Sequence, residues 1–184
     1  MGRRMKEVYP IKDRDLISEI KKYLITKNMR NYMLFSLGVN VGLRISDLRL
    51  LKVKDIKDEY IKITEIKTKK TKAFLITPKI KKELKTYTEN MTDDEYLFKS
   101  RQGYKPISRQ QVSNVLKDVQ RQFNLERNIN THTLRKTFGY HFYKQYKDVV
   151  ILQKIFNHSD PKVTLKYIDI EQEDVDKKVK NFYL

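Results

Sequence analysis

The sequence predicts a mainly α-helical chain that carries one small antiparallel β-sheet, an α+β fold class. Apolar residues recur at helical spacing through most of the chain. The spacing changes to strand-like alternation around residues 60–76. Five Gly and four Pro in 184 residues leave few interruptions, and that length is typical of one domain.

Two helices are predicted at the start of the chain, over residues 13–27 and 29–41. The first has one apolar face, whereas the second is apolar almost all round, so we expect the second to be buried. Gly42 interrupts the pattern, and a further helical stretch is expected over 45–51.

A β-hairpin is predicted next. Residues 60–66 and 73–76 are rich in β-branched and aromatic residues, which favours two short strands. Between them lies a basic turn at 67–72 with the sequence Lys-Thr-Lys-Lys-Thr-Lys. Residues 96–98 are expected to add a third strand.

Capping residues followed by apolar periodicity predict five helices from residue 77 onward. The expected N-cap residues are Thr77, Ser108, Thr131 and Asp148, and Ser159-Asp160-Pro161 is expected to open the last of these helices. The tail, residues 172–184, places its apolar side chains near one stripe and is expected to form a terminal helix.

Composition limits the classes of protein that the chain can belong to. Forty Lys and Arg against 23 Asp and Glu give a formal net charge of +17, which favours a nucleic-acid partner. A lysine-rich composition caused by an AT-rich genome is the alternative explanation. The absence of Cys excludes disulfides, thiolate chemistry and Cys-based zinc sites, and the three His are too scattered for a metal cage. No apolar run approaches the roughly 20 residues of a membrane span, and no secretory signal follows Met1, so a soluble cytoplasmic protein associated with the nucleoid is expected.

Arg44 is the first candidate for chemistry. It lies between two apolar helical segments, directly after Gly42 and Leu43. A buried guanidinium is costly unless it meets an anion or a carboxylate. Arg44 is therefore a candidate anion-binding residue, and a salt bridge to Asp47 is the structural alternative.

Four residues in the second half of the chain could serve a phosphodiester site. His132 and Arg135 lie three apart in the first turn of a predicted helix, where free amides favour an anion. His158 precedes another helix start, and Tyr167 follows nine residues later. Ordinary surface residues are the alternative for the His–Arg pair. With 12 Tyr in the chain, Tyr167 alone is more typical of a core residue than of a nucleophile.

The order of these motifs is more specific than any one of them. The chain presents Gly-Leu-Arg-Ile-Ser-Asp-Leu, a Lys-bearing hairpin, His-x-x-Arg, Asn-His-Ser and finally Tyr. This order resembles the tyrosine recombinase family, also called the phage integrase family, over residues 34–167. The separations from Arg135 to His158 and from His158 to Tyr167 are similar to those of its bacterial Xer-type members. Asn157 stands where Gly is common in the family.

The resemblance implies the catalytic-domain fold of that family and the breaking and rejoining of DNA strands. The residues that match catalytic positions are Arg44, Lys67, His132, Arg135, His158 and the nucleophile Tyr167, with Asp47 in a supporting role. In the family's scheme the tyrosine attacks the scissile phosphate and forms a 3′-phosphotyrosyl intermediate without ATP, metal or any other cofactor. The arginines hold the phosphate, His132 moves a proton at the tyrosine and His158 donates to the phosphate. Lys67 protonates the leaving oxygen, with Lys69 and Lys70 as rivals for that role.

Contacts with DNA beyond the reacting phosphate are expected to be largely sequence-blind. Basic candidates for these contacts are Lys69, Lys70, Lys72 and Lys136. Gln110, Gln111 and Asn114, near a helix start, are candidates for reading base edges in the major groove. Ordinary surface positions are the alternative for these three residues.

Most members of the family also carry an N-terminal core-binding domain, whereas about 30 residues precede the first motif helix here. We therefore expect residues 1–184 to be a single catalytic domain without it, either a natural short form or a fragment. The resemblance implies double-stranded DNA and further copies of the chain as partners, in a tetramer on paired sites, with a monomer in isolation as the alternative. The tail, 172–184, is expected either to pack into a neighbouring protomer or to fold back on its own domain.

Two other functions remain open from the sequence. One is a catalytically inactive DNA-binding module that regulates a recombinase, and the other is a type IB topoisomerase-like enzyme that relaxes supercoils without paired sites. The presence of every catalytic residue type argues against the inactive module. A nonspecific basic DNA-binding protein would not require the ordered motifs.

Overall fold

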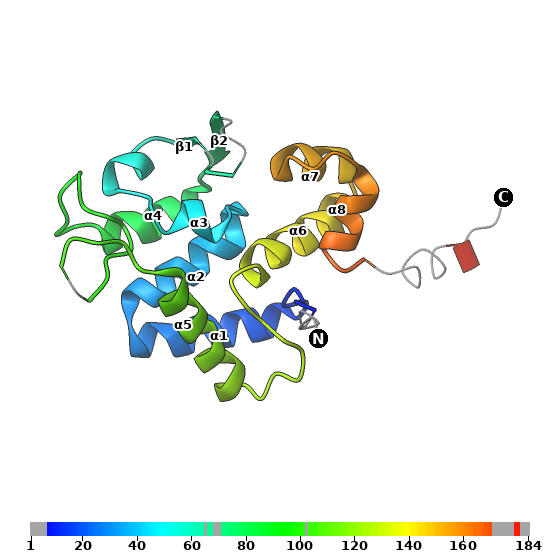
Figure 1. The fold of residues 1–184 in the computed structure, drawn as a ribbon, viewed down its shortest axis with the longest axis horizontal. Coiled ribbons are helices and arrows are strands. Elements are labelled where there is room, and N and C mark those ends of the chain that lie inside the picture. Colours follow the sequence, from blue (N-terminus) through cyan, green and yellow to red (C-terminus); the bar gives the residue numbers. More distant parts are fainter. Residues whose placement is uncertain (1–6, 65, 68–70, 102, 171–178, 181–184) are drawn as a thin grey trace, which may run out of the picture.

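The computed structural model describes residues 7–64, 66–67, 71–101, 103–170 and 179–180. It confirms a mainly helical fold with a two-stranded antiparallel sheet. In Figure 1 the first five helices and the sheet form one side of the molecule, and α6 (Thr133–Tyr146) leads from it to α7 (Val149–Phe156) and α8 (Pro161–Tyr167). Within the described part of the chain, no helix is both long and apolar enough to cross a membrane.

Helix α2 (Met29–Val41) is the centre of the main core, as its apolar sequence predicts. It packs against α1 (Arg14–Lys27), α4 (Pro78–Tyr87) and α6. Asp13 caps α1 by accepting the amides of Asp15 and Leu16, and Asn28 caps α2 by accepting the amide of Asn31. These local signals set the boundaries of both helices to within one residue of the prediction.

Gly42 ends α2 in the left-handed region, with φ of 71°. A Cβ at this position would lie 2.4 Å from the Phe138 ring, so both the backbone angle and the close approach require glycine. Helix α3 (Ile45–Leu48) is shorter than the predicted stretch over 45–51. The following 3₁₀ turn, η1 (Val53–Ile56), was not predicted from the sequence.

The predicted hairpin forms, but β1 (Tyr60–Thr64) ends two residues before the predicted bound, and β2 (Thr71–Leu75) begins two residues earlier than predicted, within the segment expected to be the turn. Tyr60 pairs with Leu75 and Thr64 with Thr71. The prediction of a third strand at 96–98 is wrong. Tyr96 makes only an isolated bridge to Lys52, and Leu97 and Phe98 are buried in the core, so their apolar character serves packing rather than a ladder.

The later helices begin as predicted, with one exception. Ser108 caps α5 (Arg109–Gln122), Asp148 caps α7 and Asp160 caps α8 through their side chains. Thr77 occupies the N-cap position of α4, but its side chain makes no capping bond.

The N-cap residue of α6 is His132 and not the predicted Thr131. The side chain of Asn130 accepts the His132 amide at 2.8 Å, and the Thr133 hydroxyl accepts the Asn130 amide at 2.9 Å. These two bonds turn the chain into the helix without Thr131.

Helices α6, α7 and α8 share a second apolar cluster, built around Leu152, Phe156 and Ile168. Gly139 of α6 permits the close approach, because a Cβ there would lie 2.6 Å from Ile168 and 2.7 Å from Phe156. The predicted tail helix at 172–184 lies outside the described residues apart from 179–180.

Candidate active site

Arg135 connects the ends of two helices that are distant in sequence. It lies on α6 and is only 3% exposed. Its Nη1 donates to the Gly42 carbonyl at 2.6 Å, and its Nη2 donates to the Phe156 carbonyl at 2.8 Å. The Phe156 ring centroid lies 4.3 Å from the guanidinium carbon. The C-terminal ends of α2 and α7 therefore hold this cation, as helix dipoles favour.

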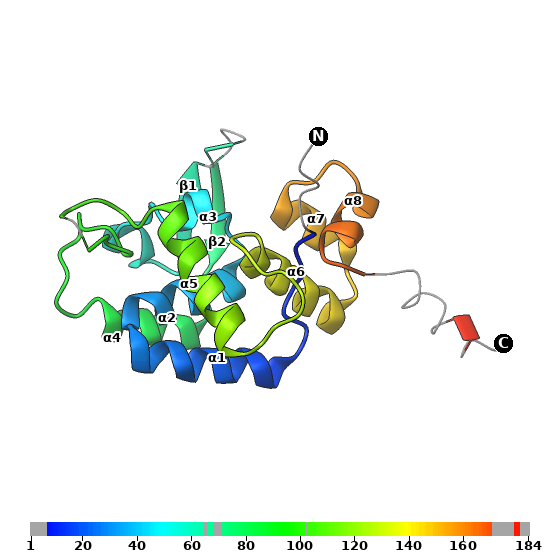
Figure 2. The same ribbon diagram turned by 60° about the horizontal axis from the view of Figure 1, so that its bottom comes forward.

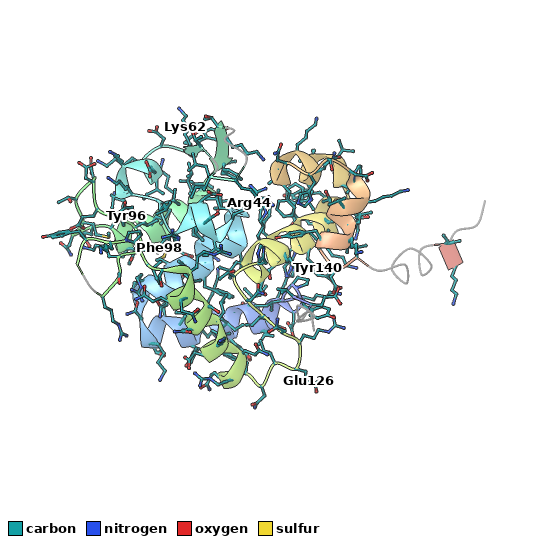
Figure 3. All side chains as sticks on the ribbon, viewed as in Figure 1. Arg44, Lys62, Tyr96, Phe98, Glu126 and Tyr140 are labelled. Atoms are coloured by element: carbon teal, nitrogen blue, oxygen red, sulfur yellow. The ribbon has the colours of Figure 1, made fainter. Side chains whose placement is uncertain are left out.

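Arg44, the N-cap residue of α3, lies two residues after Gly42. Figure 3 labels it in the middle of the molecule, between the main helical body and the α6–α8 side. Burial lowers the pKa of His158 and raises that of Tyr167, and the positive charge of Arg44 adds to the first effect and opposes the second, so Arg44 is within electrostatic reach of both groups.

Asp47 does not form the salt bridge to Arg44 that was the structural alternative. Its Oδ1 accepts the amide of Ile66 at 3.1 Å, and its Oδ2 has no hydrogen-bond partner among the described residues. Since Asp47 is only 5% exposed, its carboxylate ties α3 to the turn of the hairpin from inside the fold.

His158 lies two residues beyond the end of α7, and its Nδ1 is 3.0 Å from the hydroxyl oxygen of Thr164, a fully buried residue of α8. Desolvation is the main cause that lowers the pKa of His158, to about 4, and the charges of Arg135 and Arg44 add to it. The imidazole is therefore neutral near pH 7, and Thr164 fixes its orientation.

Tyr167 is the last residue of α8 and lies beside His158, with ring centroids 5.2 Å apart and planes at 76°. Burial raises the pKa of the Tyr167 phenol, whereas the charges of Arg135 and Arg44 and a hydrogen bond with Arg135 lower it. The Lys136 ammonium lies 5.2 Å from the phenol ring centroid. Cationic groups therefore surround the place where a phenolate would form.

His132 borders this group at the start of α6. Desolvation lowers the pKa of its imidazole, and the charges of Arg109, Lys136, Arg135 and Lys67 lower it further. Like His158, it is favoured in the neutral form, so it can accept a proton near pH 7.

The hairpin borders the site from the other side. Lys67 is exposed at the turn, and its charge acts on both His132 and His158. Lys72 on β2 donates to the carbonyls of Lys154 at 3.3 Å and Ile155 at 3.0 Å, which ties the hairpin to α7. Lys69 and Lys70 lie outside the described residues.

The three candidates for base recognition differ in whether their side chains are already bonded to other parts of the fold. Gln110 and Asn114 are exposed on α5, and their side chains bond to each other at 3.0 Å. Gln111 is used within the fold: it accepts the Ser108 amide at 2.8 Å and donates to the Ser100 hydroxyl at 3.3 Å. Only Gln110 and Asn114 therefore face outward with side chains that could be redirected to DNA.

The sequence positions singled out above thus converge. The rings of His158 and Tyr167 are in direct contact, the charges of Arg135 and Arg44 act on both, and His132 and Lys67 lie at the border. Such a group can bind an anion and present a phenol to it. The part of the chain that the structure describes contains no group of three His, Cys, Asp or Glu that could hold a metal ion.

Three residues with a clear place in the site were missed from the sequence. Thr164 orients His158, Phe156 stacks on Arg135, and Arg109 has the largest effect of any charge on His132. Arg109 had a usable signal, since it is a basic residue in the first turn of a helix. Thr164 and Phe156 had none, because their roles depend on contacts between elements.

The chain was compared with known protein families and with related proteins. The family model described as "Phage integrase family" matches residues 12–174. The chain is 48% identical over 167 residues to "Probable integrase/recombinase YoeC" of Bacillus subtilis (strain 168), and the match covers 90% of this chain and 92% of that protein. Seven other relatives are longer proteins, of which the chain spans 47–61%.

Two solved structures share the fold. The catalytic domain of bacteriophage HP1 integrase aligns with a TM-score of 0.69 at 18% identity and covers 95% of each chain. The XerH site-specific recombinase, in a post-cleavage complex with a palindromic difH substrate, aligns with a TM-score of 0.77 at 18% identity; 98% of this chain corresponds to 54% of that one.

Proposed function

Because the chain belongs to the phage integrase family, we propose that it is a site-specific DNA recombinase that acts through a covalent 3′-phosphotyrosyl intermediate. One observation supports this most: the Tyr167 ring lies edge-on to the His158 imidazole, with centroids 5.2 Å apart, and while burial raises the pKa of the phenol, the charges of Arg135 and Arg44 oppose that rise. A tyrosine that serves packing alone does not need two guanidinium charges acting on its phenol.

The proposed reaction assigns one task to each group. The Tyr167 oxygen attacks the phosphorus, the bond from phosphorus to the 5′ oxygen breaks, and the 3′ phosphate remains on the tyrosine. His132 accepts the phenolic proton, and Lys67 gives a proton to the departing 5′ oxygen. Arg44 and Arg135 stabilise the charge that develops on the nonbridging oxygens. Religation reverses these steps with a 5′ hydroxyl as the nucleophile, so ATP and metal have no required step.

His158 is proposed to donate a hydrogen bond to the phosphate. Because its low pKa keeps the ring neutral, only one nitrogen carries a proton. We assign the single Thr164 hydroxyl proton to Nδ1 at 3.0 Å rather than to the Asp160 carbonyl at 3.5 Å, which leaves the imidazole proton on Nε2, where it is available to a phosphate oxygen. In this assignment Thr164 fixes the tautomer on which the donation depends.

Double-stranded DNA is the proposed substrate. The formal charge of +17 provides a phosphate-binding surface, and Lys67, Lys136 and Arg109 bring part of that charge to the site. Outward-facing Gln110 and Asn114 on α5 are the proposed contacts with base edges. Recombination joins two duplexes, so we propose further copies of the chain on paired sites.

The proposal is tested with a pool of nicked duplexes whose bases are randomised, in which cleavage beside the nick releases a short fragment and traps the adduct. The wild type is expected to form a covalent adduct in the presence of EDTA, with the DNA attached at Tyr167 in peptide mass spectra. Tyr167→Phe is expected to bind DNA but form no adduct, and Tyr143→Phe is the matched control. An adduct on another residue, or DNA binding with no adduct from the wild type, would contradict the proposal.

The same preparation separates the rival functions. Efficient relaxation of a supercoiled plasmid that lacks the selected site would favour the topoisomerase-like activity. Joining of two fragments that both contain the selected site, without relaxation of unrelated plasmids, is the outcome expected for a recombinase.

A further inference from the structure

The segment at residues 7–13 is bound along α6. The Ile11 amide donates to the Thr137 hydroxyl at 2.9 Å, and the Ile11 carbonyl lies 3.0 Å from Nε2 of His141. The Ile11 side chain itself is 4% exposed. Figure 2 shows this segment, in dark blue, running beside α6 toward α7 and α8. Thr137 and His141 therefore fix the register of the segment on the helix, and with it the position of the next residue, Lys12.

Lys12 reaches from that segment to the end of α8. Its ammonium lies 2.7 Å from Oδ2 of Asp169 and donates to the Asp169 carbonyl at 3.2 Å. Arg127 contacts the same carboxylate at 3.4 Å. The side chain of Asp169 is 10% exposed and that of Lys12 is 34% exposed. This pair is less open to water than the ion pairs Lys54–Asp94 and Lys57–Asp93, so it is screened less.

Asp169 is two residues beyond Tyr167, at the place where α8 ends. Its backbone is left-handed, with φ of 59°, and its amide bonds to the Lys166 carbonyl at 3.3 Å. The neighbouring residue Ile168 is buried against Gly139. The other end of α8 is exposed, from Pro161 to Val163. The contacts beyond Tyr167 therefore hold the end of this short helix that carries the phenol, in addition to the contacts that Thr164 makes within it.

Asp169 is also linked electrostatically to the phenol. Its charge acts on Lys136 and opposes the desolvation that lowers the pKa of that ammonium. Lys136 in turn lies over the Tyr167 ring. The carboxylate thus fixes the C-terminal end of α8 and helps to keep Lys136 charged beside the ring.

Resting on the function proposed above, we propose that Lys12 and Asp169 are positioning residues for the nucleophile, and that the N-terminal segment sets the placement of Tyr167 through this pair. Neither side chain takes part in bond breaking. Both act by fixing the end of α8, on which the distance from the phenol to the scissile phosphate depends. A shift of about 1 Å at a reacting group can reduce a rate by up to about 100-fold, so this pair has enough influence to control cleavage.

The test uses the full chain and four variants: Lys12→Met, Lys12→Arg, Asp169→Asn and the control Lys54→Met. The control breaks an exposed ion pair of similar length, 2.8 Å, in another part of the molecule. The first measurement is hydrogen exchange of the free protein. Lys12→Met is expected to accelerate exchange of amides in 164–170 by about 10-fold, whereas Lys54→Met leaves them unchanged.

The second measurement is the single-turnover rate of adduct formation on the nicked duplex selected from the randomised pool. Lys12→Met and Asp169→Asn are each expected to slow this rate by about 10-fold at saturating protein, with the affinity for DNA unchanged. Lys12→Arg is expected to restore the wild-type rate. The double variant of Lys12→Met and Asp169→Asn should be slowed by less than the product of the two single effects, since both substitutions remove the Lys12–Asp169 pair.

The outcomes distinguish this proposal from the proposed function. If the wild type forms no adduct, the recombinase proposal fails, and hydrogen exchange alone decides whether the pair holds α8. Unchanged exchange at 164–170 in Lys12→Met overturns the positioning proposal whatever the activity. A loss of DNA affinity with an unchanged saturating rate also overturns it, because Lys12 would then act as a phosphate contact.

Discussion

Arg135→Lys separates the structural contribution of the guanidinium from its charge. Lysine keeps the positive charge, but a single ammonium can keep only one of the two bonds to the carbonyls of Gly42 and Phe156. A hydrogen bond from a charged donor contributes about 1.5–3 kcal/mol, and the contact with the Phe156 ring adds about 1 kcal/mol. We expect a loss of about 3 kcal/mol in the free energy of unfolding. In a chain of this size, that loss lowers Tm by about 6–12 °C.

Thermal unfolding followed by circular dichroism measures this shift. Arg121→Lys is the matched control, because Arg121 is exposed and contacts only Asp118 at 3.3 Å among the described ion pairs. That control is expected to change the free energy of unfolding by less than about 0.5 kcal/mol. If Arg135→Lys unfolded within about 2 °C of the wild type, the view that this side chain joins the ends of α2 and α7 would be wrong.

Three further predictions address single features of the site. Burial lowers the pKa of His158 to about 4, below that of His in an unfolded chain, so the unfolded state binds more protons between these two pKa values. The free energy of unfolding should therefore decrease as the pH falls from about 6.5 to about 4. Urea titrations should show a smaller decrease for His158→Gln. Gly139→Ala should destabilise the fold by about 1–3 kcal/mol, because its Cβ would meet Ile168 and Phe156 within 2.7 Å, and calorimetry showing an unchanged Tm would refute the close packing of α6 against α8. Lys67→Ala should slow cleavage of ordinary DNA by about 100-fold or more, but not of DNA with sulfur at the 5′ leaving position, and equal losses on both substrates would exclude Lys67 as the acid.

Local signals were sufficient to predict most of the helices. Ser108 and Asp148 each cap the helix that the sequence assigned to them, and α8 begins within the predicted Ser159-Asp160-Pro161, because a capping bond joins residues two or three apart. The apolar character of α2 likewise predicted its burial. The wrong prediction at the start of α6 involved a choice between neighbouring side chains. Asn130 replaced Thr131 as the side chain that begins α6.

The apolar composition of residues 96–98 led to the wrong prediction of a third strand, since a short apolar run is equally typical of a strand and of a buried loop. Leu97 and Phe98 are fully buried, but their backbone forms no ladder. The contacts that define the site are of a different kind. The bond from Lys12 to Asp169 spans 157 positions and the bond from Arg135 to Gly42 spans 93, so no local pattern could predict them. The motif residues could be found from their order alone, whereas the groups that orient them could not.

The anchoring of Arg135 has a consequence for selectivity among anions. A guanidinium that already donates to two carbonyls has few N–H groups left, and their directions are set before any ligand arrives. A freely rotating arginine can adapt to a carboxylate, a sulfate or a phosphate, but a guanidinium held by two carbonyls can donate only to an oxygen that approaches its remaining N–H groups. By orienting the guanidinium, the carbonyl of Gly42 restricts the direction from which an anion can bind Arg135, and so reduces the range of anions that can bind there.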